Sequence, residues 1–203
     1  HALEPYLARL IKKGYKVAII EQLEDPKKTK TLVKRGLVRI VTPGTVMEAS
    51  MLEEKENNYL IALTSQKHIF FLACCDLSTG EFFVTPIEQL PAVMNEIVRL
   101  RPRECIVPFS LYVNTELIGK IRALGCFVNG VDDYFFSSAK AETLLLQHFH
   151  LSSLRSFGLE QDSFLSCAAG ALLQYLLDTQ KNALTHIQKI VVRSDRQIML
   201  LDA

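Results

Sequence analysis

The order of apolar segments between residues 59 and 149 constrains the fold of this chain more than any other feature of its sequence. Three β-rich runs, at 59–63, 68–76 and 81–85, are separated by short polar turns, which is typical of an antiparallel meander. They are followed by an amphipathic helix from Leu90, a strand at 105–107, a helix capped by Asn114, a strand at 126–129 and a helix at 138–149. In such an order the last strands join the sheet parallel to the first, through right-handed crossovers. We therefore expect a mixed α/β fold with a five-stranded sheet and flanking helices.

The ribonuclease H-like fold has this element order, and many proteins with that fold are two-metal nucleases. Their chemistry requires several carboxylates around two Mg²⁺ ions, one of them on the first strand. The expected first strand, 59–63, contains no acid, and neither does the fourth, 105–108. Asp76 and Glu96 remain, which are too few to hold two metals, and Asp76 fits a tight turn closed by Gly80. The sequence therefore disfavours a nuclease.

A nucleotide-binding loop is also not expected. Gly125 and Gly130 have the glycine spacing of a phosphate-binding loop, but Val131 and Asp132 stand where Lys and Ser or Thr are required. An acid at that position would repel phosphate. We therefore predict no catalytic, metal or nucleotide site in this chain.

The segments on either side of the predicted sheet have different patterns. Residues 1–13 are expected to form a helix ended by Gly14, followed by a strand at 16–21, a turn or short helix from Pro26 and a strand at 37–41. These elements cannot close a core alone, so we expect the end of a small α+β unit whose beginning precedes His1. Beyond the sheet, 163–180 predicts a long helix, and 190–192 and 198–201 predict extended pieces.

The charge of the chain is unevenly distributed. The net charge is +1, but residues 1–44 carry +6 and residues 45–203 carry −5. Six cations and no acid fall within thirteen residues, namely Lys27, Lys28, Lys30, Lys34, Arg35 and Arg39. Such an asymmetry indicates contact with a polyanion by one part of the chain, or alternatively a solvated lysine-rich loop.

Composition excludes other classes of protein. With 49% hydrophobic residues the chain can form a compact core, and its longest apolar run, 69–75, is too short for a membrane span. The first thirteen residues lack the pattern of a secretory signal. None of the five cysteines forms a Cys-x-x-Cys motif, so we expect reduced, buried cysteines and a cytoplasmic protein.

Several motifs resemble the MutS family of bacterial mismatch-repair proteins. GYKVAIIEQLEDP (14–26) and VRIVTPGT (38–45) resemble the latter part of the mismatch-binding domain, and CDLSTGEF (75–82) resembles the connector domain. CAAGALLQYLLDTQ (167–180), LTHI (184–187) and the terminal LDA resemble the start of the core domain. The resemblance implies mismatch-recognition residues at 1–45, a linker at 46–57, a ribonuclease H-like connector at 58–162 and the start of the core, or lever, domain at 163–203.

The resemblance also implies a role in DNA mismatch repair. MutS proteins are dimers that bind and kink mismatched double-stranded DNA, exchange ADP for ATP and recruit MutL. The mismatch wedge would lie before His1 and the ATPase after Ala203, so this chain would be no enzyme and hold no cofactor, with ATP and Mg²⁺ bound elsewhere in the parent protein. Lys30 and Arg35 match positions near the DNA backbone in the family. Gly36 departs from the family's usual polar or basic residue, which predicts a looser start to the following strand.

Three functions are therefore weighed. The first is a part of a mismatch sensor that contacts the DNA backbone and signals through its connector. The second is a protein-docking module whose basic loop is merely solvated, and the third, disfavoured by the absent acids, is a nuclease.

Overall fold

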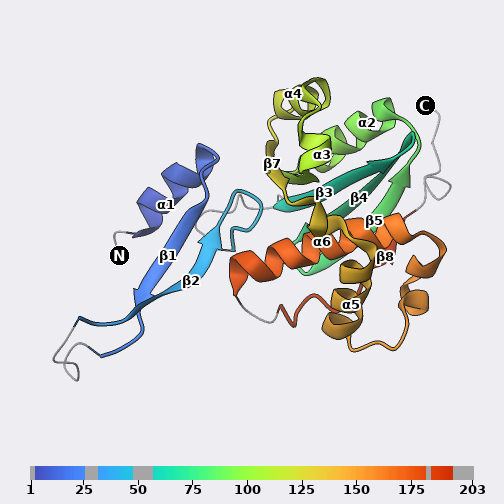
Figure 1. Cartoon of the computed structure of the whole chain (residues 1–203). Coiled ribbons are helices and arrows are strands. Elements are labelled where there is room, and N and C mark those ends of the chain that lie inside the picture. Colours follow the sequence, from blue (N-terminus) through green and yellow to red (C-terminus); the bar gives the residue numbers. More distant parts are fainter. Residues whose placement is uncertain (1–2, 26–31, 48–56, 182–183, 194–203) are drawn as a thin grey trace.

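The chain folds into a small N-terminal unit beside a larger sheet unit (Figure 1). The structure is a computed structural model that describes residues 3–25, 32–47, 57–181 and 184–193 of the 203. The predicted turn at Pro26, most of the predicted linker and the expected extended piece at 198–201 lie outside the described residues.

The N-terminal unit consists of one helix and a two-stranded hairpin. Helix α1 (Leu3–Lys12) ends before Gly14, whose φ of +82° suits the turn that leads into β1 (Val17–Gln22). Strand β2 (Arg35–Val41) pairs antiparallel with β1, with a register shift between Ile19 and Ile20. The core of this unit is a cluster of five buried side chains, Leu7, Ile11, Ile19, Val41 and Val46.

Gly36 is part of the β1–β2 ladder. It pairs with Glu21, and Arg35 pairs with Gln22, while the register shift lies just beyond it, where Ile19 pairs with Arg39 and Ile20 with Leu37. A Cβ atom at Gly36 would lie 2.7 Å from Cδ1 of Leu23, so the leucine side chain occupies the space that the glycine leaves. The looser start expected of this strand stays a prediction.

The sheet unit contains the predicted meander and crossovers. Strands β3 (Tyr59–Gln66), β4 (Ile69–Asp76) and β5 (Glu81–Ile87) are antiparallel neighbours, while β6 (Glu104–Pro108) pairs parallel with β3 and β7 (Phe127–Val131) parallel with β6. The chain adds a sixth strand, β8 (Val191–Val192), parallel to β5, so the order is β7-β6-β3-β4-β5-β8. The predicted mixed sheet is confirmed with one strand more than expected.

Helices cover both faces of this sheet (Figure 1). One face packs against α2 (Leu90–Leu100) and α4 (Thr115–Ala123). Asn114 caps the start of α4, because its side-chain oxygen accepts the backbone N–H of Leu117. Between them lies the short α3 (Phe109–Tyr112). The other face packs against α5 (Ser138–Phe149) and α6 (Ser163–Gln180), with the 3₁₀ turns η1 (Asp133–Phe136), η2 (Leu154–Phe157) and η3 (Leu159–Gln161) around them.

Helix α6 is buried on nearly all sides against β3, β4, β5 and α5. The sequence resemblance placed a domain boundary at residue 163, immediately before this helix. In the structure that boundary falls inside the packed sheet unit, because residues such as Leu172 and Leu176 fill the core over the central strands. A helix that is apolar around most of its circumference requires neighbours on every side, and here the sheet, α5 and the end of β2 provide them.

Candidate nucleic-acid interface

The β1–β2 hairpin projects away from the sheet unit (Figure 1). Arg35, one of the two predicted DNA-backbone contacts, is exposed at the first position of β2. Lys30, the other, lies outside the described residues, between the two strands in sequence. Of the two predicted contacts, Arg35 is therefore the one that the described residues place on the hairpin.

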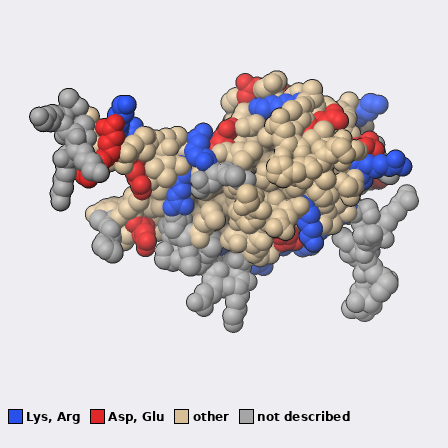
Figure 2. Space-filling view, turned by 90° about the horizontal axis from the view of Figure 1, so that it is seen from below, with Lys and Arg blue, Asp and Glu red and all other residues tan. Residues whose placement is uncertain are grey.

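Charges of both signs meet on this hairpin. Lys34 Nζ lies 3.9 Å from a carboxylate oxygen of Glu24, and the Lys34 side chain is 80% exposed. Figure 2 shows acidic and basic side chains side by side on the N-terminal unit, and a largely uncharged surface on the body of the sheet unit. An exposed ion pair of this kind is weak and screened by salt, so it leaves the lysine able to exchange its partner for another anion.

The base of the hairpin is a buried turn, residues 42–45. The backbone N–H of Thr45 donates to the carbonyl of Thr42 at 3.0 Å, and the N–H of Thr42 donates to Thr45 Oγ1 at 2.9 Å. Both threonine side chains are fully buried. Pro43 and Gly44 end the ladder, as the sequence predicts, and the turn is inserted against the sheet unit rather than left in solvent.

The turn meets a fully buried carboxylate, Glu104, at the first position of β6. Oε2 of Glu104 accepts the hydroxyl of Thr42 and the backbone N–H of Gly44, the latter at 2.9 Å. Oε1 accepts Asn129 Nδ2 at 2.7 Å and the hydroxyl of Tyr175 at 2.6 Å. Burial and the neighbouring Glu104 raise the pKa of Tyr175 far above its usual value, so its phenol keeps the proton that it donates.

Close packing surrounds this carboxylate. A Cβ atom at Gly44 would lie 2.9 Å from Cβ of Glu104 and 3.0 Å from Cβ of Leu60, so only glycine lets the turn approach β3 and β6 this closely. Lys16 Nζ lies 5.2 Å from the centre of the Tyr175 ring, within the range of a cation–π contact. The main chain of Gly14 packs on the ring of Phe127. These contacts join the N-terminal unit to β3, β6, β7 and α6 of the sheet unit.

Glu104 is an acid on the fourth strand, where the sequence analysis placed none, because β6 begins one residue earlier than expected. It does not restore a nuclease site. Glu104 pairs with Leu60 and Asp76 with Tyr59, so alternation along β3 places the two carboxylates on opposite faces of the sheet. Asp76 accepts the backbone N–H groups of Asn58 and Ser78, and Glu96 is paired with Arg99. In the part of the chain that the structure describes, no three metal-binding side chains form a cluster.

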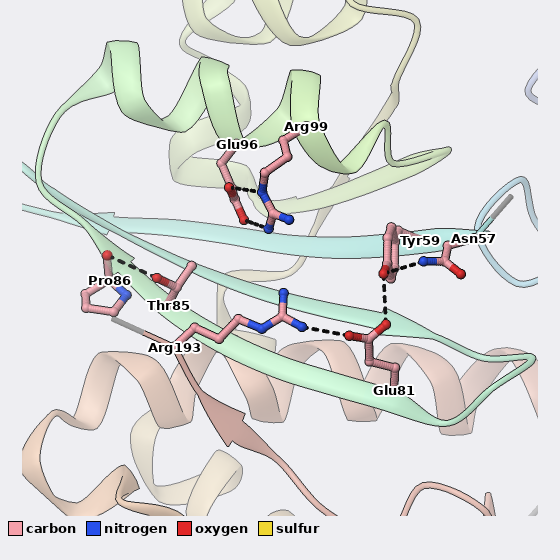
Figure 3. Close-up of polar contacts among 8 residues, drawn as sticks. All are labelled: Asn57, Tyr59, Glu81, Thr85, Pro86, Glu96, Arg99 and Arg193. Atoms are coloured by element: carbon pink, nitrogen blue, oxygen red, sulfur yellow. Dashed lines mark hydrogen bonds and ion pairs between the residues drawn. The ribbon is translucent and has the colours of Figure 1, made fainter. Parts of the chain in front are cut away.

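A second polar group lies where β3 and β5 begin (Figure 3). The Tyr59 hydroxyl donates to Glu81 at 2.8 Å and accepts Asn57 Nδ2 at 2.5 Å. Arg193 donates to the other Glu81 oxygen at 2.7 Å, and its guanidinium lies 3.5 Å from the centre of the Phe83 ring. Burial, with the hydrogen bond to Glu81 and the charge of that residue, raises the pKa of Tyr59 to about 12. This group fixes the start of β3 to the residue that follows β8.

The five cysteines are free and buried, as predicted. Burial raises the pKa of every one of these thiols, that of Cys126 to about 12, so none is a nucleophile in the folded chain. Among the described helices, none is both long enough and apolar enough to cross a membrane.

The defining architecture is thus a small unit with a hairpin, packed against a mixed sheet that has helices on both faces. Comparison with known families identifies the class of protein to which this architecture belongs. The MutS domain II family model matches residues 58–188, and the MutS domain I family model matches residues 1–50. The chain belongs to the MutS family.

Curated relatives agree over the whole chain. Each is a DNA mismatch repair protein MutS: one from Methanococcoides burtonii is 41% identical over 206 residues, and one from Symbiobacterium thermophilum is 43% identical over 205 residues. A third, from Methanosarcina acetivorans, is 42% identical over 217 residues. All of this chain is covered in each case, against 23%, 23% and 24% of those relatives in the order given, so it spans about a quarter of their length.

Proposed function

We propose that this chain is the part of a DNA mismatch-repair sensor that contacts the DNA backbone and connects that contact to the rest of the machine. The observation that carries the proposal is the match to MutS domains I and II, in that order, over residues 1–50 and 58–188. The exposed Arg35 on a projecting hairpin supports it, because cations on such an element position a duplex through its phosphates without reading sequence.

The proposal assigns no catalysis to this chain. The parent protein would be a homodimeric, DNA-dependent ATPase of the cytoplasm that binds ATP and Mg²⁺ in a separate part. MutL would dock on the exposed surface of the sheet unit, which corresponds to the connector. A crosslinking scan of single-cysteine variants over that surface, made in the full-length parent protein, tests this assignment, and the absence of ATP-dependent crosslinks to MutL at every position would refute it.

Binding to DNA is tested by fluorescence anisotropy with matched and G·T duplexes at several salt concentrations. We expect weak binding, with a Kd of roughly 10⁻⁴ to 10⁻⁶ M, and no preference for the mispair. Lys30→Ala and Arg35→Ala should each weaken binding equally to both duplexes and reduce the slope of log K against log salt by about one. ATP should change nothing.

Lys120→Ala is the matched control. Lys120 is a surface lysine on α4 of the sheet unit, paired with Glu116 at 2.6 Å, so its loss removes the same charge at a site away from the hairpin. If the control weakens binding as much as Arg35→Ala, the attraction is only net charge. If neither hairpin variant changes affinity or slope, the hairpin is a solvated face and the chain is a docking module.

A further inference from the structure

The four hydrogen bonds to Glu104 are divided between its two oxygens according to the unit from which they come. Oε1 accepts only groups of the sheet unit, Asn129 on β7 and Tyr175 on α6. Oε2 accepts only groups of the N-terminal unit, Thr42 and Gly44. One side of the sheet unit therefore fixes the carboxylate, and the oxygen that remains faces the turn of the other unit.

This arrangement makes the contact directional. Glu104 and Tyr175 are both held by regular secondary structure, since Glu104 lies in the β3–β6 ladder and Tyr175 in the long buried helix α6. Thr42 directly follows β2, so the orientation of the turn is the orientation of the strand that carries Arg35. Arg35 lies seven residues from Thr42, about 23 Å along an extended strand, and a tilt of about 10° at the turn would move it by about 4 Å.

We propose that Glu104 is a positioning residue: its carboxylate holds the N-terminal unit in one orientation on the sheet unit and so aims the hairpin. Close approach at Gly44 and the contact between Lys16 and Tyr175 assist, but neither has a direction as well defined as hydrogen bonds to a fixed carboxylate. The consequence for DNA rests on the proposed function. The positioning itself does not.

The orientation is measured by double electron–electron resonance between spin labels at Leu37→Cys on β2 and Lys120→Cys on α4, both at exposed positions. The native cysteines are buried, so the labels attach only to the introduced ones. The doubly labelled chain that retains Glu104 should give one narrow distance distribution. Glu104→Gln places an NH₂ group against donors and should broaden it at least about twofold, because hydrogen bonds to a charged group hold the turn.

Thr42→Val is the milder variant, and it retains Glu104 while removing one donor to Oε2. It should also broaden the distance distribution, though by less than Glu104→Gln. If Glu104→Gln does not fold, the width measured for Thr42→Val tests the proposal. Amide exchange at residues 42 and 44–46 should accelerate about tenfold or more in either variant, with exchange in β3–β5 and α6 unchanged. Glu96→Gln is the control, since Glu96 pairs with Arg99 of the same helix, α2, on the opposite face of the sheet from Glu104.

A distribution that stays narrow with an unchanged mean in both Glu104→Gln and Thr42→Val would overturn the proposal. Anisotropy with duplex DNA on the same variants separates this outcome from failure of the proposed function. If the distribution broadens and DNA affinity does not change, Glu104 positions the unit as proposed, and the hairpin is not the DNA contact.

Discussion

The two units of this chain solve the problem of burial in different ways. The sheet unit encloses a large hydrophobic cluster on each face of its sheet, beneath helices from both sides. The described part of the N-terminal unit has a hydrophobic cluster of only five buried side chains and leaves apolar ones such as Tyr6, Ile20 and Leu37 exposed. The stability of the sheet unit arises from its own core, whereas the position of the N-terminal unit depends on its contacts with the sheet unit. A polar junction centred on Glu104 is therefore most consequential for the smaller unit.

The largest expected effect is a loss of core volume in the sheet unit. Leu172→Ala removes a fully buried side chain of α6 and should lower the free energy of unfolding by about 3 kcal/mol. Leu7→Ala in the small cluster should cost about 1–2 kcal/mol, because its thin surroundings can collapse around the gap. Urea unfolding followed by circular dichroism measures both. Equal losses would mean that the two cores are equally tight, and Leu172→Met serves as the volume-conserving control.

A second test concerns a close approach between two helices, α5 and α6. A Cβ atom at Gly170 of α6 would lie 2.4 Å from Cβ and 2.6 Å from Cα of Ala141 on α5. Gly170→Ala should therefore destabilise the sheet unit by about 1 kcal/mol or more in thermal unfolding. Gly119→Ala, in α4, has no neighbour within 4 Å and should instead stabilise by up to about 1 kcal/mol. The reverse order of the two variants would show that the α5–α6 contact is loose.

The polar margin of the sheet unit makes a prediction about pH. The pKa of Tyr59 is about 12 in the folded chain, against 10.0 for a free phenol, because burial and Glu81 oppose the charged form. The neutral Tyr59 phenol therefore makes its full contribution to the free energy of unfolding below pH 10, and this contribution is lost as the pH rises towards 12. An ultraviolet titration of the chain minus that of Tyr59→Phe should isolate the transition. A difference midpoint near 10 would indicate that water reaches this phenol.

The smallest effects should come from ion pairs on the two surfaces. Glu24→Gln breaks the pair with Lys34 on the hairpin, and Glu116→Gln breaks the pair with Lys120 on α4. Each should change the free energy of unfolding only slightly, and less still at high salt, because exposed ion pairs are weak and screened. Chemical denaturation in low and high salt checks both. A larger effect at Glu24 alone would mean that the hairpin depends on its own charges for order.

The elements that sequence predicted well are those specified by neighbouring residues. The helix at 138–149 was predicted with the bounds that the structure has, and Asn114 caps α4 as its position indicated. The turn from Asp76 to Gly80 likewise depends on local acceptors and one φ of +76°. In each case the signal and the structure lie within a few residues, so the pattern sufficed.

What escaped prediction depends on distant partners. β8 comprises two residues, and only the free edge of β5 makes them a strand. Glu104 gave no local signal, since an acid before a buried strand is typical of a solvated flank. Its four donors come from a turn, a strand and a helix that the fold brings together. The predicted DNA contacts at Lys30 and Arg35 stay a prediction.

The same four bonds also set an order of events during folding. Thr42 lies 62 residues and Tyr175 71 residues from Glu104 in sequence, so the junction closes two long loops. Local helices and the meander close much shorter loops and form first. During synthesis the N-terminal unit leaves the ribosome before its seat exists, because α6 is made last among the partners. Docking of the turn at the base of the hairpin is therefore a late step. Until the sheet unit is complete, the nascent N-terminal unit stays undocked and its apolar side chains stay uncovered.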